Sequence, residues 1–433
     1  MRMYDIIYKK RMGGELTGEE IDFFIDGYCN GSIPDYQVSA LLMAICFNSM
    51  TREETLYLTE AMLRSGDTVD LSSIEGVCAD KHSTGGVGDK TTLIITPIIA
   101  SLGVKVAKMS GRGLGFTGGT VDKLESIPGY KTSLTTEEFL STVKRTGICV
   151  TGQSGNLAPA DKRLYALRDV TATVDSIPLI ASSIMSKKLA SGSHTIVLDV
   201  KTGNGAFMKD LDGSIALARA MVEIGKGAGK NMRALITDMN RPLGYYVGNS
   251  LEVYEAIKTL KGEAKGDLYD LCIELSASIV SASLSVPLDT SREKCIDAVH
   301  SGKAYNKMKE WIEAQGGDIS YVENPESLLS APYRVEYKAK ASGYVDEIHA
   351  EAIGIASMLL GAGRRSKEDE IDLLAGIELK VRRGDEIKAG DTLALLYTSD
   401  KAKIKDCTDV LDTGFEITES KPKESVLIYT VIE

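Results

Sequence analysis

The hydrophobic and polar positions of residues 17–65 follow a helical pattern, without the alternation typical of strands. Residues 17–20 and 51–54 both read Thr-x-x-Glu, the spacing of a capping box, in which each side chain satisfies a free backbone amide of the other residue. Between them, the apolar stretch 38–47 is long enough for a buried helix. Residues 160–190 again look helical, so we predict one helical domain built from two separate segments.

From about residue 78, short apolar runs alternate with Gly-rich turns and helical stretches. This order of strand, turn and helix predicts an α/β domain with a mainly parallel sheet. Residues 251–315 add amphipathic helices that fit either domain. The strands are expected at 103–109, 148–151, 195–200 and 233–237, and helices at 137–145 and 215–225.

The pattern changes again at about residue 332, where short apolar segments are joined by Gly-Asp turns. It predicts a small α+β module with a barrel-like sandwich similar to biotinyl and lipoyl domains. The modified lysine of those carriers lies between two methionines, and no such tripeptide occurs here. We therefore interpret the module as structural rather than as a carrier. The predicted segments are 1–70 and 160–192 for the helical domain, 71–159 and 193–331 for the α/β domain, and 332–433 for the C-terminal module.

Length, charge and cysteine usage narrow the class of protein. The 433 residues suffice for two or three domains of about 150 residues each. A formal net charge of −11 argues against a nucleic-acid partner, because neutralising phosphates needs a basic face. The seven cysteines form no Cys-x-x-Cys pair, which favours reduced thiols over disulfides or a zinc cluster. Without a signal peptide or an apolar run of membrane-spanning length, we expect a soluble, cytoplasmic protein with no membrane partner.

Glycine is over-represented, with 42 residues where average usage of about 7% predicts roughly 30. One concentration is the run Lys81-His-Ser-Thr-Gly-Gly-Val-Gly88, which leads into an apolar stretch that looks helical. Glycine lets the backbone approach an anion, and amides at a helix N-terminus point towards it. The run is not a Walker A loop, because Lys90 follows Asp89 rather than glycine. It predicts a phosphate loop of another kind, with a structural Gly-rich turn as the alternative.

A second concentration is the run Ser110-Gly-Arg-Gly-Leu-Gly-Phe-Thr-Gly-Gly-Thr-Val-Asp-Lys-Leu-Glu125. It follows a predicted strand, where α/β sheets place their ligand sites. Hydroxyl, cationic and glycine residues recur in both runs, whereas a long structural loop would not need them. Two such loops on neighbouring strands are therefore expected to enclose one phosphate.

The two runs resemble the phosphate loops of the thymidine and pyrimidine-nucleoside phosphorylase family, and the resemblance extends over essentially the whole chain. It implies an all-α domain and a larger α/β domain flanking a cleft, assembled as a homodimer. The implied reaction is reversible phosphorolysis in nucleoside salvage, without an organic cofactor. A pyrimidine nucleoside (uridine, thymidine or deoxyuridine) and inorganic phosphate give the free base and an α-pentose 1-phosphate.

The resemblance also assigns site residues. The base is implied to contact Tyr165, Arg168, Ser183 and Lys187, with His82 near its carbonyl group. Their spacings of three and four residues agree, because each pair then shares one face of a helix. From the residues alone, a solvated helix face is the alternative for the two cations. Phosphate is implied to contact Lys81, His82, Ser83, Thr92, Lys108, Met109, Ser110 and Thr120.

This reaction explains the types of side chain at the base site. When phosphate attacks the anomeric carbon, negative charge grows on the departing pyrimidine, and Arg168 and Lys187 are expected to stabilise it. Ser183 and His82 are expected to orient the ring. His82 is also a candidate proton donor, because the ordinary pKa of histidine lies near neutrality. No nucleophilic side chain is required, since phosphate itself attacks.

The resemblance further implies a bound monovalent cation, with K⁺ expected. Only Glu255 offers it a side-chain ligand, so the sequence by itself gives no sign of this site. Several relatives carry a small residue at position 246, where this chain has tyrosine. The implied ligands are main-chain oxygens of Gly88 and Lys90, together with Leu243, Tyr246 and Glu255.

The sequence leaves two questions open: the substrate range, and whether the protein belongs to another class of enzyme. The thymidine-specific relatives carry Met at the position of Lys108, so we predict broad specificity that includes uridine. A thymidine-specific enzyme is the alternative. Anthranilate-type phosphoribosyltransferases look similar in fold and in their Gly-Gly loop, but the run at 110–125 speaks against them.

Overall fold

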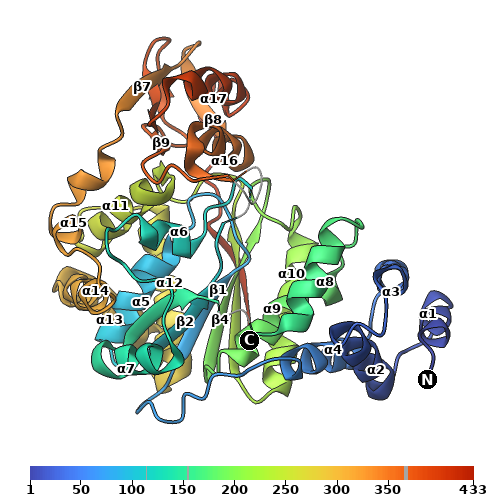
Figure 1. Ribbon diagram of the computed structural model, residues 1–433. Coiled ribbons are helices and arrows are strands. Elements are labelled where there is room, and N and C mark those ends of the chain that lie inside the picture. Colours follow the sequence, from blue (N-terminus) through green and yellow to red (C-terminus); the bar gives the residue numbers. More distant parts are fainter. Residues whose placement is uncertain (114, 154–155, 365–368) are drawn as a thin grey trace.

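The computed structural model describes residues 1–113, 115–153, 156–364 and 369–433. A helical bundle flanks one side of a larger α/β body, and a small module sits at the top of that body (Figure 1). Leu114, a member of the second Gly-rich run, lies outside the described residues. Among the residues described, no helix combines the length and apolar character needed to span a membrane.

Six helices from two separate segments form the helical domain. Both predicted capping boxes are present, at the starts of the second and fourth helices. Leu164 and Leu179 of the later segment pack into the same apolar cluster as the first four helices. The two segments therefore share one core, as predicted. The helices are α1 (Met3–Arg11), α2 (Gly18–Cys29), α3 (Asp35–Asn48), α4 (Arg52–Arg64), α8 (Pro159–Asp169) and α9 (Ile177–Ala190).

The α/β body is built on a central sheet of order β1-β4-β5-β13. Its first three strands are parallel, and a parallel pair, β2 and β3, continues the layer through a bridge between Cys78 and Lys105. The carboxyl ends of β1 and β2 consequently lie side by side. Every predicted strand falls on one of these: β1 (Ala79–Ser83), β2 (Val106–Ser110), β3 (Ile148–Gly152), β4 (Thr195–Thr202), β5 (Asn231–Asp238) and β13 (Ile428–Ile432).

Helices cover both faces of this layer (Figure 1). The strongly apolar α5 is buried between the sheet and other helices, because nine of its eleven residues are buried. Its N-terminus follows the first Gly-rich run. These helices are α5 (Thr91–Ser101), α6 (Thr120–Glu125), α7 (Thr136–Thr146), α10 (Leu211–Gly227), α11 (Asn249–Leu260), α12 (Asp267–Leu284), α13 (Leu288–His300), α14 (Lys303–Ala314), α15 (Ser320–Glu323) and the 3₁₀ turn η1 (Pro325–Leu329).

The C-terminal module contains two small antiparallel sheets, of order β6-β9-β11-β7 and β10-β8-β12. Its apolar residues belong to the same cluster as those of the α/β body, so the module is packed onto that body. Its elements are β7 (Tyr333–Lys338), β8 (Gly343–Ile348), α16 (Ala350–Ser357), η2 (Met358–Ala362), β9 (Gly376–Leu379), β10 (Glu386–Ile387), β11 (Thr392–Thr398), η3 (Lys401–Lys403), α17 (Ile404–Leu411) and β12 (Phe415–Thr418).

The prediction that residues 332–433 form one module is wrong at its end. β13 leaves the module, pairs antiparallel with β5, and packs Ile432 against the apolar cluster of the central sheet. Conversely, β6 (Tyr246–Val247) leaves the α/β segment and pairs with β9. A short β-branched strand fits any free sheet edge, so local pattern does not reveal which edge it joins.

Candidate active site

The first Gly-rich run comprises the end of β1 and most of the loop that leads to α5. Gly85 and Gly88 have φ angles of 95° and 74°, which glycine adopts without strain. A Cβ atom on Gly88 would lie 2.5 Å from the carbonyl oxygen of Leu243, so only glycine fits there. Thr91 and Thr92 begin α5, whose N-terminal end carries the positive pole of the helix dipole. The loop therefore offers backbone and hydroxyl donors to an anion.

The second Gly-rich run forms the loop between β2 and α6. A Cβ atom on Gly119 would lie 2.1 Å from the backbone nitrogen of Gly113, so the two glycines allow a close approach. Asp122 holds the loop from inside: it accepts a hydrogen bond from the amide of Gly113 at 2.6 Å and pairs with Arg112 and Arg364 at 3.1 and 3.0 Å. The sequence by itself gave no sign of this role for Asp122.

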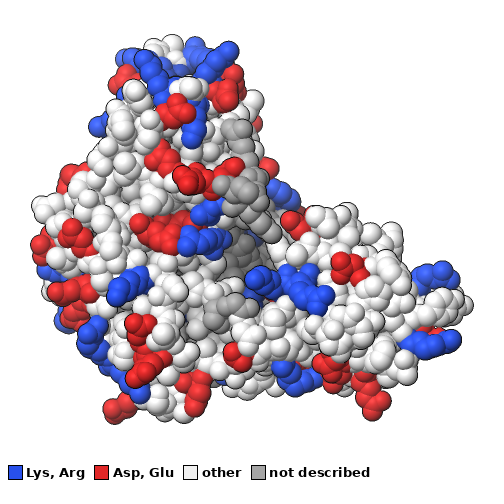
Figure 2. Space-filling model, in the orientation of Figure 1, with Lys and Arg blue, Asp and Glu red and all other residues white. Residues whose placement is uncertain are grey.

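These two loops and α9 enclose a cavity of about 290 Å³, near the lower end of the ~300–1,000 Å³ typical of small-molecule sites. Figure 2 shows this face hollowed between the helical domain and the body, with Lys and Arg side chains at both walls. Ile184, Lys187 and Lys188 of α9 line the helical wall. The loop wall includes seven of the eight residues predicted to contact phosphate: His82, Ser83, Thr92, Lys108, Met109, Ser110 and Thr120.

Buried lysines and aspartates form a network that includes two residues of the cavity lining, Lys108 and Lys188. Lys81, the eighth predicted phosphate residue, lies 3.1 Å from Asp199, and Asp80 pairs with both Lys108 and Lys188 at 2.9 and 2.8 Å. Burial by itself raises the pKa of Asp80, but the two ammonium groups lower it well below its usual range. Burial lowers the pKa of Lys108 to about 8, although the charge of Asp80 opposes that shift.

His82 lies on the cavity with its Nε2 atom buried and without a hydrogen-bond partner among the residues described. Burial lowers its pKa well below the ordinary value, and the charges of Lys188 and Lys108 lower it further. The imidazole is therefore neutral at neutral pH in the free protein. The lowered pKa argues against His82 as a proton donor in the free protein, and its Nε2 atom is available to hydrogen-bond a ligand.

Ser183 and Lys187 lie on one face of α9, as their spacing predicts. The Nζ atom of Lys187 lies 3.2 Å from the Oγ atom of Ser183 and forms an ion pair with Asp161 of α8. Lys187 reaches the cavity, whereas Ser183 is buried behind it. Asp161 was not predicted, because its partner lies on another helix and no local motif joins them.

Arg168 and Tyr165 do not line the cavity. The guanidinium of Arg168 is buried and donates to the carbonyl oxygens of Thr173, Val174 and Leu179 at 3.1, 2.7 and 3.1 Å. Tyr165 is 41% exposed, with its ring 5.9 Å from the Arg168 guanidinium carbon. These carbonyl groups satisfy Arg168 locally, so contact between Arg168 and a base stays a prediction.

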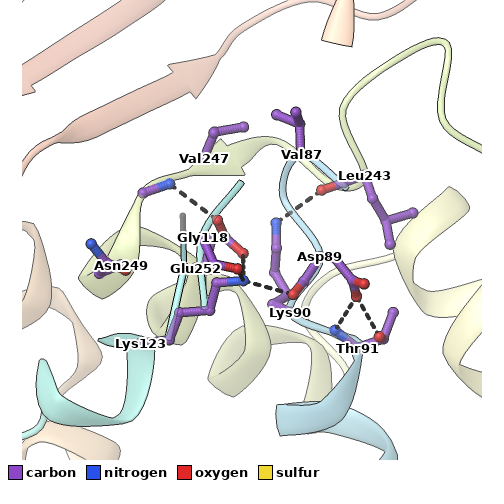
Figure 3. Close-up of polar contacts among 12 residues, drawn as sticks. Val87, Asp89, Lys90, Thr91, Gly118, Lys123, Leu243, Val247, Asn249 and Glu252 are labelled. Atoms are coloured by element: carbon purple, nitrogen blue, oxygen red, sulfur yellow. Dashed lines mark hydrogen bonds and ion pairs between the residues drawn. The ribbon is translucent and has the colours of Figure 1, made fainter. Parts of the chain in front are cut away.

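The oxygens predicted to hold a monovalent cation do not fit one in this chain. The ammonium group of Lys90 lies among them and donates to the carbonyl oxygens of Leu243 and Tyr246 at 2.9 and 2.7 Å, and to Glu255 at 2.5 Å. Figure 3 shows the Lys90 side chain directed at the oxygen of Leu243. The main-chain oxygen of Gly88 already accepts from the amide of Lys90. The ammonium group of Lys90, to which the sequence assigned no role, therefore lies where the ion was predicted.

Comparison with known proteins covers all three parts of the chain. Family models match residues 4–66 (glycosyl transferase family, helical bundle domain), 75–305 (glycosyl transferase family, a/b domain) and 344–418 (pyrimidine nucleoside phosphorylase C-terminal domain). Anthranilate phosphoribosyltransferase from Thermus thermophilus matches with a TM-score of 0.59 over 72% of this chain and 99% of that one. At 18% identity, this likeness shows the fold alone.

Curated relatives match along their whole length. The pyrimidine-nucleoside phosphorylase of Geobacillus stearothermophilus is 55% identical over 433 residues, and that of Bacillus subtilis is 54% identical, with each chain fully covered. The enzyme of the same name from Staphylococcus epidermidis is also 54% identical over its full length. Together with the cavity between two Gly-rich loops and a helical wall, this similarity shows that the chain belongs to the pyrimidine-nucleoside phosphorylase family.

Proposed function

We propose that this protein catalyses the reversible phosphorolysis of pyrimidine nucleosides in nucleoside salvage. Uridine, thymidine and deoxyuridine would each give the free base and an α-pentose 1-phosphate. Full-length similarity to curated pyrimidine-nucleoside phosphorylases supports this proposal. The observation that carries it is the cavity, which has hydroxyl groups, glycine backbone and Lys108 on one wall and Lys187 on the other.

In this proposal, the two Gly-rich loops bind phosphate. Hydroxyl groups such as those of Ser83, Ser110 and Thr120 donate hydrogen bonds, while Lys108 and the deeper Lys81 neutralise its charge. One phosphate oxygen attacks C1′ of the sugar, and the bond from C1′ to the base breaks with its electron pair moving into the ring. Direct displacement inverts the anomeric carbon, which accounts for the α product.

The wall formed by α9 receives the base. Lys187 stabilises the negative charge that grows on the departing ring, and Asp161 and Ser183 hold its ammonium group in position. His82 is neutral, so it orients the base through a hydrogen bond rather than by supplying a proton. Arg168 and Tyr165 reach the base only when the helical domain closes on the body, a movement that would also exclude water.

Lys108 favours a broad substrate range. Its ammonium group is held by Asp80 at the edge of the phosphate wall, where it also lies within the cavity that must receive the sugar. A cationic donor there tolerates or binds a 2′-hydroxyl group. Steady-state assays with uridine and thymidine test this directly: we expect comparable kcat/KM values, and turnover of thymidine alone would show the thymidine-specific alternative instead.

We further propose that the protein works as a cytoplasmic homodimer. Helices α1 and α3 expose several large aromatic side chains, including Tyr4, Tyr36 and Phe47, at 65%, 74% and 82%. Figure 1 places these helices at the end of the molecule farthest from the C-terminal module, where a second copy can cover them. All seven cysteines are free thiols, as suits a reducing compartment.

A further inference from the structure

Lys90 is the feature that the proposed reaction leaves unexplained. It is the residue directly before α5, yet its side chain is fully buried and points away from the cavity. Its Nζ atom lies among Leu243, Tyr246 and Glu255, which come from a different part of the chain. A buried lysine is costly unless its charge is paired and its donors are satisfied.

The surroundings of Lys90 supply one acceptor for each N–H donor of its ammonium group. An ammonium group has three N–H bonds, and it finds two carbonyl oxygens and one carboxylate oxygen. Glu255 is fixed in turn by the backbone amides of Tyr245 and Tyr246, at 2.6 and 3.1 Å. The oxygens are thus held in place independently of Lys90, as in a preformed cation site.

Two glycines allow the close contacts within this cluster, because a side chain at either position would clash with it. A Cβ atom on Gly244 would lie 2.4 Å from the carboxylate of Glu255, and one on Gly88 would lie 2.5 Å from the oxygen of Leu243. The amide of Leu243 also donates to the carbonyl oxygen of Val87, within the first Gly-rich run. The cluster therefore ties that loop to the segment around residue 243 and to α11.

A second buried lysine anchors the other loop to the same helix. Lys123 of α6 pairs with Glu252 at 2.9 Å and donates to the carbonyl oxygen of Asp89 at 2.7 Å, as Figure 3 shows. Glu252 and Glu255 are three residues apart, on one face of α11. Each Gly-rich loop is thus fixed to α11 by one lysine–glutamate pair.

We infer that Lys90 is a tethered cation: its ammonium group permanently fills the site where related enzymes are expected to bind a monovalent ion. The first phosphate loop is then ordered without K⁺, and Lys90 acts as a positioning residue. Only the activity measurement below rests on the proposed function; the stability measurement does not.

The first experiment uses the unaltered protein. After dialysis into tetramethylammonium salts, we expect the same melting temperature and the same kcat/KM for phosphate as in KCl of equal ionic strength. Tetramethylammonium is the comparison ion because it is bulky and donates no hydrogen bond. The inference would be overturned if KCl raised the melting temperature by several degrees or increased kcat/KM several-fold. If phosphorolysis is absent in every salt, the proposed function fails. The melting temperatures in the two salts still test whether Lys90 is a tethered cation.

The second experiment removes the ammonium group. Lys90→Ala is expected to lower the melting temperature in tetramethylammonium salts and to regain part of it with K⁺, NH₄⁺ or ethylammonium, which bind the vacated oxygens. Lys90→Met fills the same space without charge, so its melting temperature should fall and not recover. An Ala variant as stable as the unaltered protein, or one that no small cation restores, would contradict the inference. If neither variant folds, the salt comparison on the unaltered protein remains decisive.

Discussion

At the scale of single residues, the active site is defined by buried lysines that pair with buried aspartates. Asp80 pairs with Lys108 and Lys188, which line the cavity, and Asp199 pairs with the deeper Lys81 and Lys201. An anion entering the cavity meets these charges where water is scarce, so their attraction is stronger than at the surface. The acidic chain, with its net charge of −11, is thus locally basic at one point.

Lys108 makes phosphate capture depend on pH. Its pKa of about 8 is lower than that of an ordinary lysine, so the ammonium form is complete below that pH and is lost as the pH rises through it. We expect kcat/KM for phosphate to fall between about pH 7.5 and 9.5, a profile that reports the free enzyme. Lys108→Met should bind phosphate more weakly with a flat profile over this range. An equal decline in the variant would exclude Lys108 as the titrating group.

Site residues that lie within one motif could be predicted from the sequence, whereas those that depend on a distant partner could not. Seven of the eight predicted phosphate residues line the cavity because they lie in the two Gly-rich runs or within four residues of them, near the ends of β1 and β2. Asp80, Asp161 and Lys188 were not singled out, since each acts through a partner on another element. Lys90 was assigned by its backbone oxygen alone, and only the folded chain reveals what its side chain does.

At the scale of elements, the Gly-rich loops depend on positions where there is no room for a side chain. Gly119→Ala would place a Cβ atom 2.1 Å from the nitrogen of Gly113, so the loop must shift. We expect a loss of about 1–3 kcal/mol in the free energy of unfolding, measured by denaturant titration. Gly111→Ala is the matched control, because its Cβ atom would meet no atom within 4 Å and should leave stability unchanged. Equal stability of both variants would show that the close approach is not required.

Periodicity predicted the helical segments and the parallel strands β2, β3, β4 and β5, but it missed β1 and did not reveal the pairing of short strands. The capping boxes, the helix α3 and the buried helix α5 follow from local spacing and composition, although α3 is buried on one face only and exposes Tyr36 and Phe47. β6 and β13 each join a sheet outside their own segment, and their few residues carry no signal of that choice. Pairing of this kind is decided by which edge the rest of the fold leaves free.

At the scale of the whole molecule, α9 joins the two halves of the cavity. Leu179 packs in the core of the helical domain, while Met185 and Leu189 pack with the central sheet and α10. Lys187 on the same helix faces the phosphate loops. Movement of the helical domain therefore acts directly on the wall that is proposed to hold the base.

The proposed homodimer makes a separate prediction at this scale. Replacing Tyr36 and Phe47 with aspartate puts two charges on the exposed aromatic face, and we expect light scattering to show a monomer. The control is Val426→Asp. This side chain is 52% exposed and lies outside α1 and α3, so the variant should leave the dimer intact. A monomeric unaltered protein, or a double variant that stays dimeric, would contradict the assignment of this interface.

The most direct test of the central proposal is the release of uracil from uridine and of thymine from thymidine, with and without inorganic phosphate. We predict that both bases appear only when phosphate is present, each with an equal amount of pentose 1-phosphate. Lys187→Ala should lower the rate by on the order of 100-fold, as expected for loss of a group that stabilises developing negative charge. Base release at the same rate without phosphate, or no release with it, would contradict the account.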